Sequence, residues 1–123
     1  MTDEKQKGMA VRRAVLGDAY VDRAEASRTP LNSEFHDLLT RYAWGEIWMR
    51  PGLDRRTRSC ITVAMLVALN RNDELATHIR GALRNGVTAD ELKEILLQTT
   101  IYCGVPAANT AFGVAAKVLA EAG

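Results

Sequence analysis

Four arginines that follow two tryptophans are the residues of this sequence most suited to chemistry. Residues 41–59 read RYAWGEIWMRPGLDRRTRS, just ahead of a long apolar stretch. The arginines are Arg50, Arg55, Arg56 and Arg58. A cation at a helix start opposes the macrodipole by a few tenths to about 1 kcal/mol, whereas guanidinium forks and free backbone N–H groups suit a carboxylate or phosphate there. We therefore expect this segment to bind a small anion.

Two residues could carry a proton for such a site. His78 stands in the helical pattern ELATHIRGAL, directly after the apolar stretch. A pocket between the two helices would hold an imidazole that titrates near neutrality, although a lone histidine on a helix also serves structural roles. Glu46 stands between Trp44 and Trp48, where we expect it to be buried and therefore paired with a cation or protonated. His36 is expected on the polar surface of its helix.

The aromatic and basic residues each admit a second interpretation. Tyr42, Trp44 and Trp48 could form core, since aromatic side chains carry the largest burial energies, or they could line a ligand pocket. The arginines could form a solvated face that is partly ion-paired with Asp54. A small anion suits them better than nucleic acid, because no basic patch with interleaved stacking residues occurs elsewhere.

Composition narrows the possible functions. The 123 residues are 47% hydrophobic and 25% charged, and their formal net charge is +1. A net charge this small gives no electrostatic field strong enough to attract the whole chain to nucleic acid or an acidic membrane. Cys60 and Cys103 are the two cysteines, with 42 residues between them, so the sequence has neither a CxxC redox pair nor a zinc ligand set. We expect both thiols to be reduced and structural.

Two absences in the sequence point to a soluble cytoplasmic protein. The N-terminal segment MTDEKQKGMAVRR lacks the apolar core of a signal peptide. No later window approaches the ~20 consecutive apolar residues that cross a bilayer.

Helical spacing dominates the whole sequence and predicts an all-α fold of six to seven helices. We expect one compact domain over residues 1–123, with a helical N-terminal arm over 1–28 and a core over 29–123. The arm breaks near Gly17, and Asp18 is expected to cap its second helix. The next helix is expected to be capped by Asn32. The face that it should bury carries Phe35, Leu38, Leu39 and Tyr42.

Four further helices are expected in the core. The first runs over about 54–70 and the second over 73–85, which Asn85 and Gly86 should end in a left-handed cap. A capping box at Thr88 starts the third helix, and the Gly-Val-Pro at 104–106 separates it from the last, which reaches about 122. The small residues AANTAFGVAA at 107–116 allow close helix approach, so we expect a homo-oligomer that packs through such a face.

Six stretches of the sequence closely resemble the carboxymuconolactone decarboxylase family. They are RYAWGEIW at 41–48, RPGL at 50–53, TRS at 57–59, MLVALN at 65–70, NGVT at 85–88, and Gln98 with IYCGVPAAN at 101–109. The resemblance covers nearly the entire chain. The resemblance implies an all-helical, alkylhydroperoxidase-like fold and a homo-oligomer, commonly a hexamer.

The resemblance also implies an activity, the decarboxylation of γ-carboxymuconolactone to β-ketoadipate enol-lactone in protocatechuate catabolism. The substrate is its own electron sink, so no metal, pyridoxal or thiamine cofactor is expected. Two alternatives remain, a non-catalytic binder of a small carboxylate and an alkylhydroperoxidase-like antioxidant. The antioxidant proteins of this fold use a CxxC pair followed four residues later by histidine. If His78 matches that histidine, Arg71 and Glu74 stand where the thiols would be.

The chemistry of this reaction suggests a role for each candidate residue. Arg50, Arg55 and Arg58 would hold the carboxymethyl arm and the lactone oxygen of the substrate. An apolar wall for the departing carboxylate would come from Tyr42, Trp44 and Trp48. His78 is the first candidate for the proton donor, and Glu46 is the second candidate or the group that sets the protonation of His78.

Overall fold

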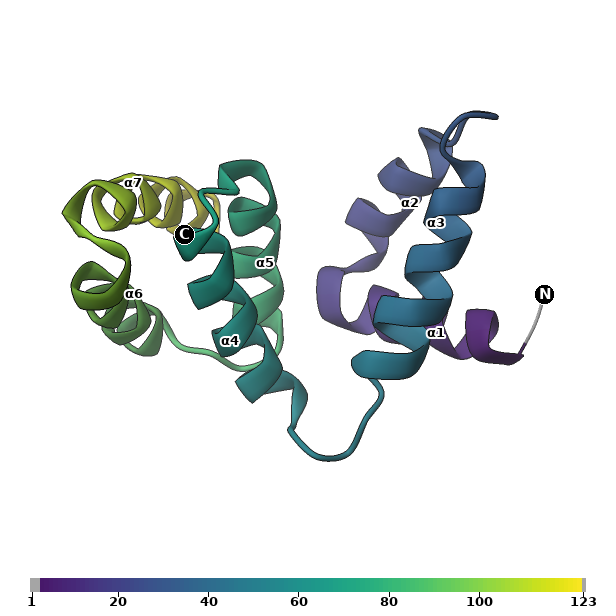
Figure 1. The fold of residues 1–123 in the computed structure, drawn as a ribbon, viewed down its shortest axis with the longest axis horizontal. Helices are drawn as coiled ribbons and strands as arrows, with labels where there is room; N and C mark the ends of the chain where they lie inside the picture. The colour runs from purple at the N-terminus through teal and green to yellow at the C-terminus, as the bar shows by residue number, and fades with distance from the viewer. Residues whose placement is uncertain (1–2, 123) are drawn as a thin grey trace. The chain divides into compact units, whose positions relative to one another are not determined.

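The computed structural model describes residues 3–122, which form helices joined by turns and loops, with no strand in that range (Figure 1). Seven α-helices and one π-helix follow one another: α1 (Asp3–Leu16), α2 (Asp18–Ala26), α3 (Ser33–Leu39), the π-helix η1 (Thr40–Ile47), α4 (Arg55–Ala68), α5 (Asn72–Arg84), α6 (Ala89–Cys103) and α7 (Val105–Ala122). The predicted all-α fold is confirmed. The chain divides into two compact units, Met1–Asp54 and Arg55–Gly123, and each is described by itself.

The N-terminal unit depends on a close crossing of two backbones, α1 and η1. A Cβ atom on Gly8 would lie 2.1 Å from the carbonyl oxygen of Thr40, and one on Gly45 would lie 2.5 Å from the carbonyl oxygen of Glu4. Only glycine allows the two helices to approach this closely. The crossing lies beside a small core that consists of Val11, Val15, Leu16, Val21 and Trp44.

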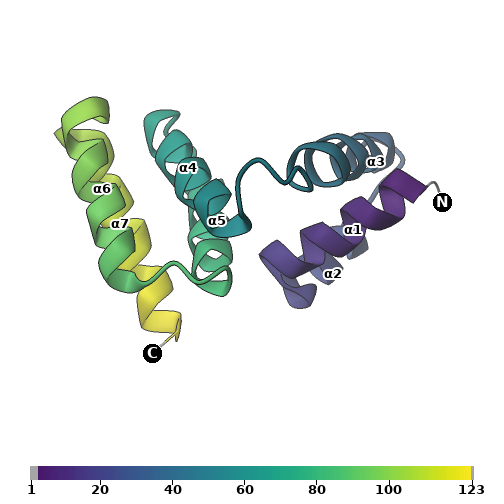
Figure 2. The same cartoon turned by 90° about the horizontal axis from the view of Figure 1, so that it is seen from below.

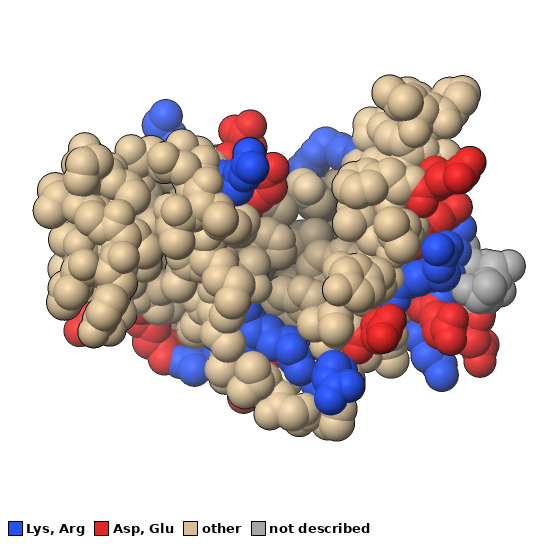
Figure 3. All heavy atoms as spheres, in the orientation of Figure 1, with Lys and Arg blue, Asp and Glu red and all other residues tan. Residues whose placement is uncertain are grey.

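Ion pairs connect three helices of the N-terminal unit. Arg12, which is 5% exposed, donates to Glu25 across 3.3 Å, and Glu25 also accepts from Arg28. Arg28 and Lys5 both reach Asp37, at 2.9 and 2.7 Å. These two cations hold the pKa of the Asp37 carboxyl below its ordinary value. Figure 3 shows acidic and basic side chains gathered over this unit.

The face that α3 buries differs from the prediction. Phe35, Leu38 and Tyr42 are 57%, 50% and 58% exposed, so the apolar stripe predicted for the core faces outward. Tyr42 lies in η1, which begins at Thr40. A π-helical turn holds more residues than an α-helical turn, so η1 changes which residues share a face from that point on. In η1 the inward residues are Thr40 and Trp44, which are 0% and 7% exposed.

Two local predictions in this unit are wrong, and a third is right in position only. His36 is half-buried rather than on the surface, and its Nδ1 is buried without a hydrogen-bond partner among residues 3–122. Gly17 occupies the N-cap of α2, while the carboxylate of Asp18 accepts from Arg13 instead. Asn32 is the N-cap of α3, but its Oδ1 accepts from the backbone N–H of Thr29.

The C-terminal unit surrounds its own hydrophobic core. Figure 2 shows α6 and α7 side by side, and α5 packs on both α4 and α7. The most buried members are Val63 and Val67 of α4, Leu75 and Ile79 of α5, Leu92 and Leu96 of α6, and Ala111, Ala115 and Val118 of α7. Half of the small-residue face predicted for a subunit contact is therefore used inside the chain.

The helix ends of the C-terminal unit follow the predicted capping. Gly86 has φ 94° after the C-cap Asn85, and the N–H of Val87 donates to the carbonyl of Ala82, which completes a Schellman motif. At the start of α6, Thr88 and Glu91 form both bonds of the capping box. None of the helices in residues 3–122 combines the length and hydropathy needed to cross a bilayer.

Replacing Gly8 by alanine should destabilise the protein by about 1–3 kcal/mol, the usual cost of overpacking, because the Thr40 carbonyl that the new methyl group meets is backbone. Urea denaturation followed by circular dichroism measures the change. Gly113→Ala in α7 is the matched control. Its Cβ meets open space, so it should stabilise by roughly 0.5–1 kcal/mol. Equal stability of Gly8→Ala and the wild type would contradict the crossing geometry.

Candidate active site

The hairpin of α4 and α5 is fixed by a buried polar bond. The amide of Asn85 donates to the hydroxyl of Ser59 across 3.0 Å, and Ser59 is 1% exposed. The bond joins the start of α4 to the end of α5, so it sets which faces of the two helices meet. His78 lies seven residues before Asn85 on the same face of α5, about 10 Å along the helix axis.

His78 is half-buried on this hairpin. Burial lowers the pKa of its imidazole from the ordinary 6.5, and the carboxylate of Glu74, one turn earlier, only partly opposes the shift. The side chain is therefore mainly neutral at pH 7 in the free protein. A neutral imidazole can accept a proton and can also donate a hydrogen bond, so His78 is chemically suited to proton transfer.

The first turn of α4 concentrates positive charge. Arg55, Arg56 and Arg58 all fall within its first four residues, and no acidic residue does. Glu91 forms an ion pair with Arg56 through one carboxylate oxygen, while the other oxygen completes the capping box of α6. Arg55 is exposed and Arg58 is half-buried. The structure thus places Arg56 in an ion pair with Glu91. Anion binding by Arg55 and Arg58 stays a prediction.

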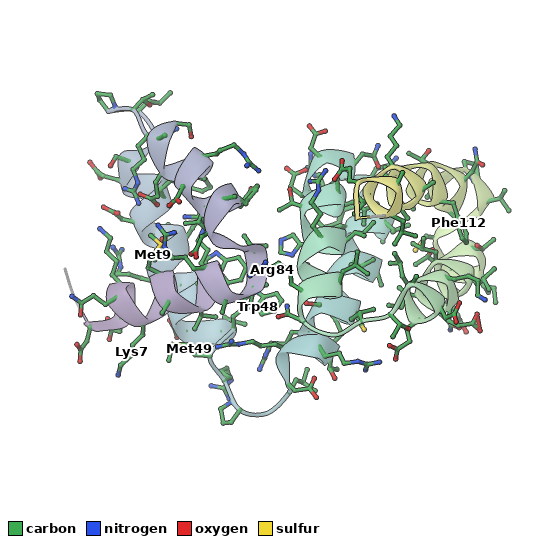
Figure 4. All side chains as sticks on the ribbon, turned by 180° about the vertical axis from the view of Figure 1, so that it is seen from behind. Lys7, Met9, Trp48, Met49, Arg84 and Phe112 are labelled. Carbon is green, nitrogen blue, oxygen red and sulfur yellow. The ribbon has the colours of Figure 1, made fainter. Side chains whose placement is uncertain are left out.

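The candidate residues of η1 lie on two different faces. Trp44 belongs to the core and stacks on Trp48, with ring centroids 5.1 Å apart and planes at 28°. Figure 4 shows Trp48 and Met49 at the end of this helix. Tyr42 and Glu46 face outward and line a pocket of about 600 Å³ together with Arg41, Leu38, Gly45 and Glu4.

The predicted burial of Glu46 is wrong, because this residue is exposed. Its position follows from η1, which turns Trp44 toward the core and Glu46 to the outer face. The carboxylate therefore does not need to pair or take up a proton to avoid the cost of burial.

The candidates predicted from the sequence divide between the two units. Tyr42, Trp44, Glu46, Trp48 and Arg50 belong to the N-terminal unit. Arg55, Arg58 and His78 belong to the C-terminal unit, where one hairpin carries all three. Sequence analysis missed Ser59 and Asn85, which hold that hairpin together. The only signal was their presence in the TRS and NGVT stretches.

The two cysteines are free thiols, as predicted, and both are half-buried. They line one groove between α4 and α6 although 42 residues separate them in the sequence. Within residues 3–122 no group of three or more histidine, cysteine or acidic side chains is placed to hold a metal ion.

Comparison with known proteins identifies the family. The model of the carboxymuconolactone decarboxylase family matches residues 33–117. The chain is also 46% identical, over its entire length and 93% of the relative, to 4-carboxymuconolactone decarboxylase from Acinetobacter baylyi. The chain belongs to the carboxymuconolactone decarboxylase family. This confirms the predicted family and the predicted class of enzyme, a carboxy-lyase.

Other relatives show that this family contains more than one named activity. The chain is 41% identical to nitrosuccinic acid decarboxylase from Metarhizium robertsii, over 92% of the chain and 79% of the relative. A 4-carboxymuconolactone decarboxylase sequence from Pseudomonas putida is 53% identical over 36% of the chain. The two long matches are thus to carboxy-lyases named for different substrates.

The bond between Ser59 and Asn85 should appear as coupling between two substitutions. Asn85→Ala leaves a buried hydroxyl unsatisfied, which should cost about 1–3 kcal/mol of unfolding free energy. In the double variant Ser59→Ala, Asn85→Ala the hydroxyl is absent, so the two effects should fall short of additivity by at least about 0.5 kcal/mol. Urea denaturation of the four proteins measures this cycle, and strict additivity would show that the bond does not hold the hairpin.

The lowered pKa of His78 should make stability depend on pH. The unfolded chain holds its imidazole proton up to about pH 6.5, whereas the folded protein releases it at lower pH. Unfolding therefore takes up a proton between these two pKa values, and stability should rise with pH through that interval.

Thermal unfolding from pH 5 to 8 tests this dependence, with His78→Gln as the variant in which this contribution should vanish. NMR titration of the His78 ring in the wild type provides the independent readout. A ring pKa above 6.5, or an identical pH dependence in the variant, would contradict the burial of the imidazole.

Proposed function

We propose that this protein decarboxylates γ-carboxymuconolactone to β-ketoadipate enol-lactone without a cofactor, in the breakdown of protocatechuate. The observation that carries the proposal is the 46% identity to a decarboxylase of that name over the full length of the chain. The cationic start of α4 and the half-buried His78 support it, because the substrate is a dianion and the reaction needs one proton.

The substrate supplies its own electron sink. One ring carbon carries both a carboxylate and a carboxymethyl arm, and a ring double bond connects it to the lactone carbonyl. When the bond to the carboxylate breaks, carbon dioxide leaves and the electron pair delocalises through the ring onto the carbonyl oxygen. A proton then adds to the carbon beside that carbonyl. The protein must anchor the arm, stabilise the developing oxyanion and provide the proton.

The α4–α5 hairpin can meet these three demands. Arg55 and Arg58 offer charge-assisted bonds to the arm and the oxyanion, and the helix start adds free backbone N–H groups. His78 is neutral in the free protein, so it must gain a proton before it can give one. A bound dianion favours the imidazolium and raises the pKa of His78 again. Substrate binding itself would then cause His78 to take up the proton that it later donates.

The remaining candidates keep their predicted roles as part of this proposal. Arg50 would share the substrate anion with the arginines of α4. Tyr42 and Trp48 would provide apolar surface for the departing carboxylate, with Trp44 behind Trp48. Glu46, which is exposed, would act as the second candidate for proton transfer.

The fungal relative motivates a second candidate substrate. Nitrosuccinate also has a carbon that carries a carboxylate, a carboxymethyl arm and an electron-withdrawing group, and its nitro oxygens take the electron pair that the lactone carbonyl takes. The 41% identity to nitrosuccinic acid decarboxylase favours testing it. Both substrates contain a succinate unit, so the same cationic helix start could hold either.

The deciding experiment supplies the purified protein with γ-carboxymuconolactone and, in parallel, 2-nitrosuccinate, each with a chelator and no added cofactor. We expect release of carbon dioxide together with loss of lactone absorbance. Faster turnover of 2-nitrosuccinate would reassign the substrate. Stabilisation by the lactone without carbon dioxide release would favour the carboxylate-binding alternative, and stoichiometric reduction of an alkyl hydroperoxide would favour the antioxidant alternative.

Variants separate binding from proton transfer. Arg58→Ala should raise KM about 10- to 100-fold, which corresponds to the loss of one charge-assisted bond, with kcat nearly unchanged. His78→Gln should lower kcat by roughly 10²- to 10⁴-fold. Arg80→Ala is the matched control, since Arg80 pairs with Glu121 at the surface of α5. Full turnover by His78→Gln would remove this residue from the mechanism.

The proposal includes the assembly and location predicted from the sequence. We propose that the protein is a homo-oligomer, a hexamer of identical chains, and that it works in the cytoplasm. Size measurement in solution tests the assembly, and cell fractionation tests the location.

A further inference from the structure

The C-terminal unit exposes several large apolar side chains on α4, the turn that follows it, α6 and the first residue of α7. The exposed fractions are 38% for Ile61, 58% for Met65, 65% for Leu69, 75% for Ile101, 79% for Tyr102 and 67% for Val105. We call these six residues the α4–α6 face. Figure 3 shows that charged side chains are sparse over α4 and α6 in this view.

A groove lies between the two helices of this face. Its volume is about 490 Å³, and its walls include Cys60, Ala64, Ile95, Thr99 and Cys103. Ile61 and Tyr102 of the α4–α6 face form its edges. Glu94 is the one charged residue among those that line it, so a charged ligand has little to pair with there.

The exposed area is large enough for a stable protein contact. At roughly 200 Å² for each large apolar side chain, the exposed fractions amount to on the order of 800 Å². This is about what each partner buries in a standard interface, and it exceeds the few hundred Å² usual for an apolar patch on a monomer. Water contact at such a face would be costly, so we expect it to be covered.

We infer that the α4–α6 face is the surface through which two copies of this chain bind each other. The face carries both halves of a self-complementary contact. Ile61, Met65 and Leu69 recur every four residues along α4 and into the turn that follows it, and Ile61 also lines the groove. In a two-fold contact, these side chains of each copy can pack into the groove of the other. Methionine, tyrosine and few charges are also typical of interface cores.

This inference rests on the homo-oligomer proposed above and names its surface, but it does not depend on the substrate. It also moves the contact away from α7, where the sequence predicted it. Ala108, Ala111 and Ala115 are at most 4% exposed because they pack inside their own unit. The small residues of α7 that remain exposed offer little apolar area by comparison.

The test compares charge substitutions on two faces of the C-terminal unit. Met65→Lys and Ile101→Lys place a cation on the α4–α6 face, whereas Gly113→Lys places one on α7, where a Cβ meets open space. Sedimentation velocity over a 100-fold range of concentration gives the dissociation constant. We expect the wild type and Gly113→Lys to assemble alike, and the other two variants to dissociate at least 100-fold more readily with unchanged helical circular dichroism.

Cys60 and Cys103 provide a second readout, because both line the groove. Their reaction with a thiol reagent should be slow in the assembled wild type and should accelerate in Met65→Lys. A wild type that is monomeric at every concentration would overturn both the oligomer and its surface. Assembly that survives Met65→Lys and Ile101→Lys, assembly lost only in Gly113→Lys, or thiols that react equally fast in all proteins would overturn the surface alone. Decarboxylation is assayed separately and bears on neither result.

Discussion

The positive charge at the start of α4 is the constraint on which the proposed site depends. Three arginines stand in the first turn, where the helix macrodipole is already positive, and no acidic side chain shares that turn. Glu91 of α6 forms an ion pair with Arg56 and so neutralises the charge of one of these three arginines. In the proposed site, the dianionic substrate would add negative charge beside Arg55 and Arg58 and so reduce this electrostatic cost.

His78 is the proposed proton donor of the hairpin. The hydrogen bond between Ser59 and Asn85 helps to fix how α4 and α5 meet. Burial lowers the pKa of the imidazole. In the proposed mechanism, the negative charge of the substrate would raise that pKa again, and His78 would then hold the proton that the carbanion needs. The buried bond keeps α5 in register with the cationic turn of α4. These features explain how a small helical unit could catalyse decarboxylation without a cofactor, provided the substrate delocalises its own electrons.

Much of the fold could be predicted because its signals are local. The ends of α5 and α6 follow from Gly86 and from the Thr88–Glu91 capping box, and both act within a few residues. The outward position of Tyr42 could not be predicted, since η1 changes the helical phase from Thr40 onward. In the site, the arginines and His78 stand out by residue type. The exposure of Glu46 and the Ser59–Asn85 bond do not, because they depend on how separate helices meet. The division of the chain after Asp54 also depends on which helices contact one another. The predicted single domain over 1–123 stays a prediction.

The central claim is that this chain breaks a carbon–carbon bond and then protonates the carbon beside the lactone carbonyl. Turnover of γ-carboxymuconolactone in deuterium oxide tests both steps at once, with carbon dioxide and the labelled product followed together. The account predicts one carbon dioxide and one deuterium at that carbon for each lactone consumed. Consumption without carbon dioxide, or no consumption at all, would contradict it.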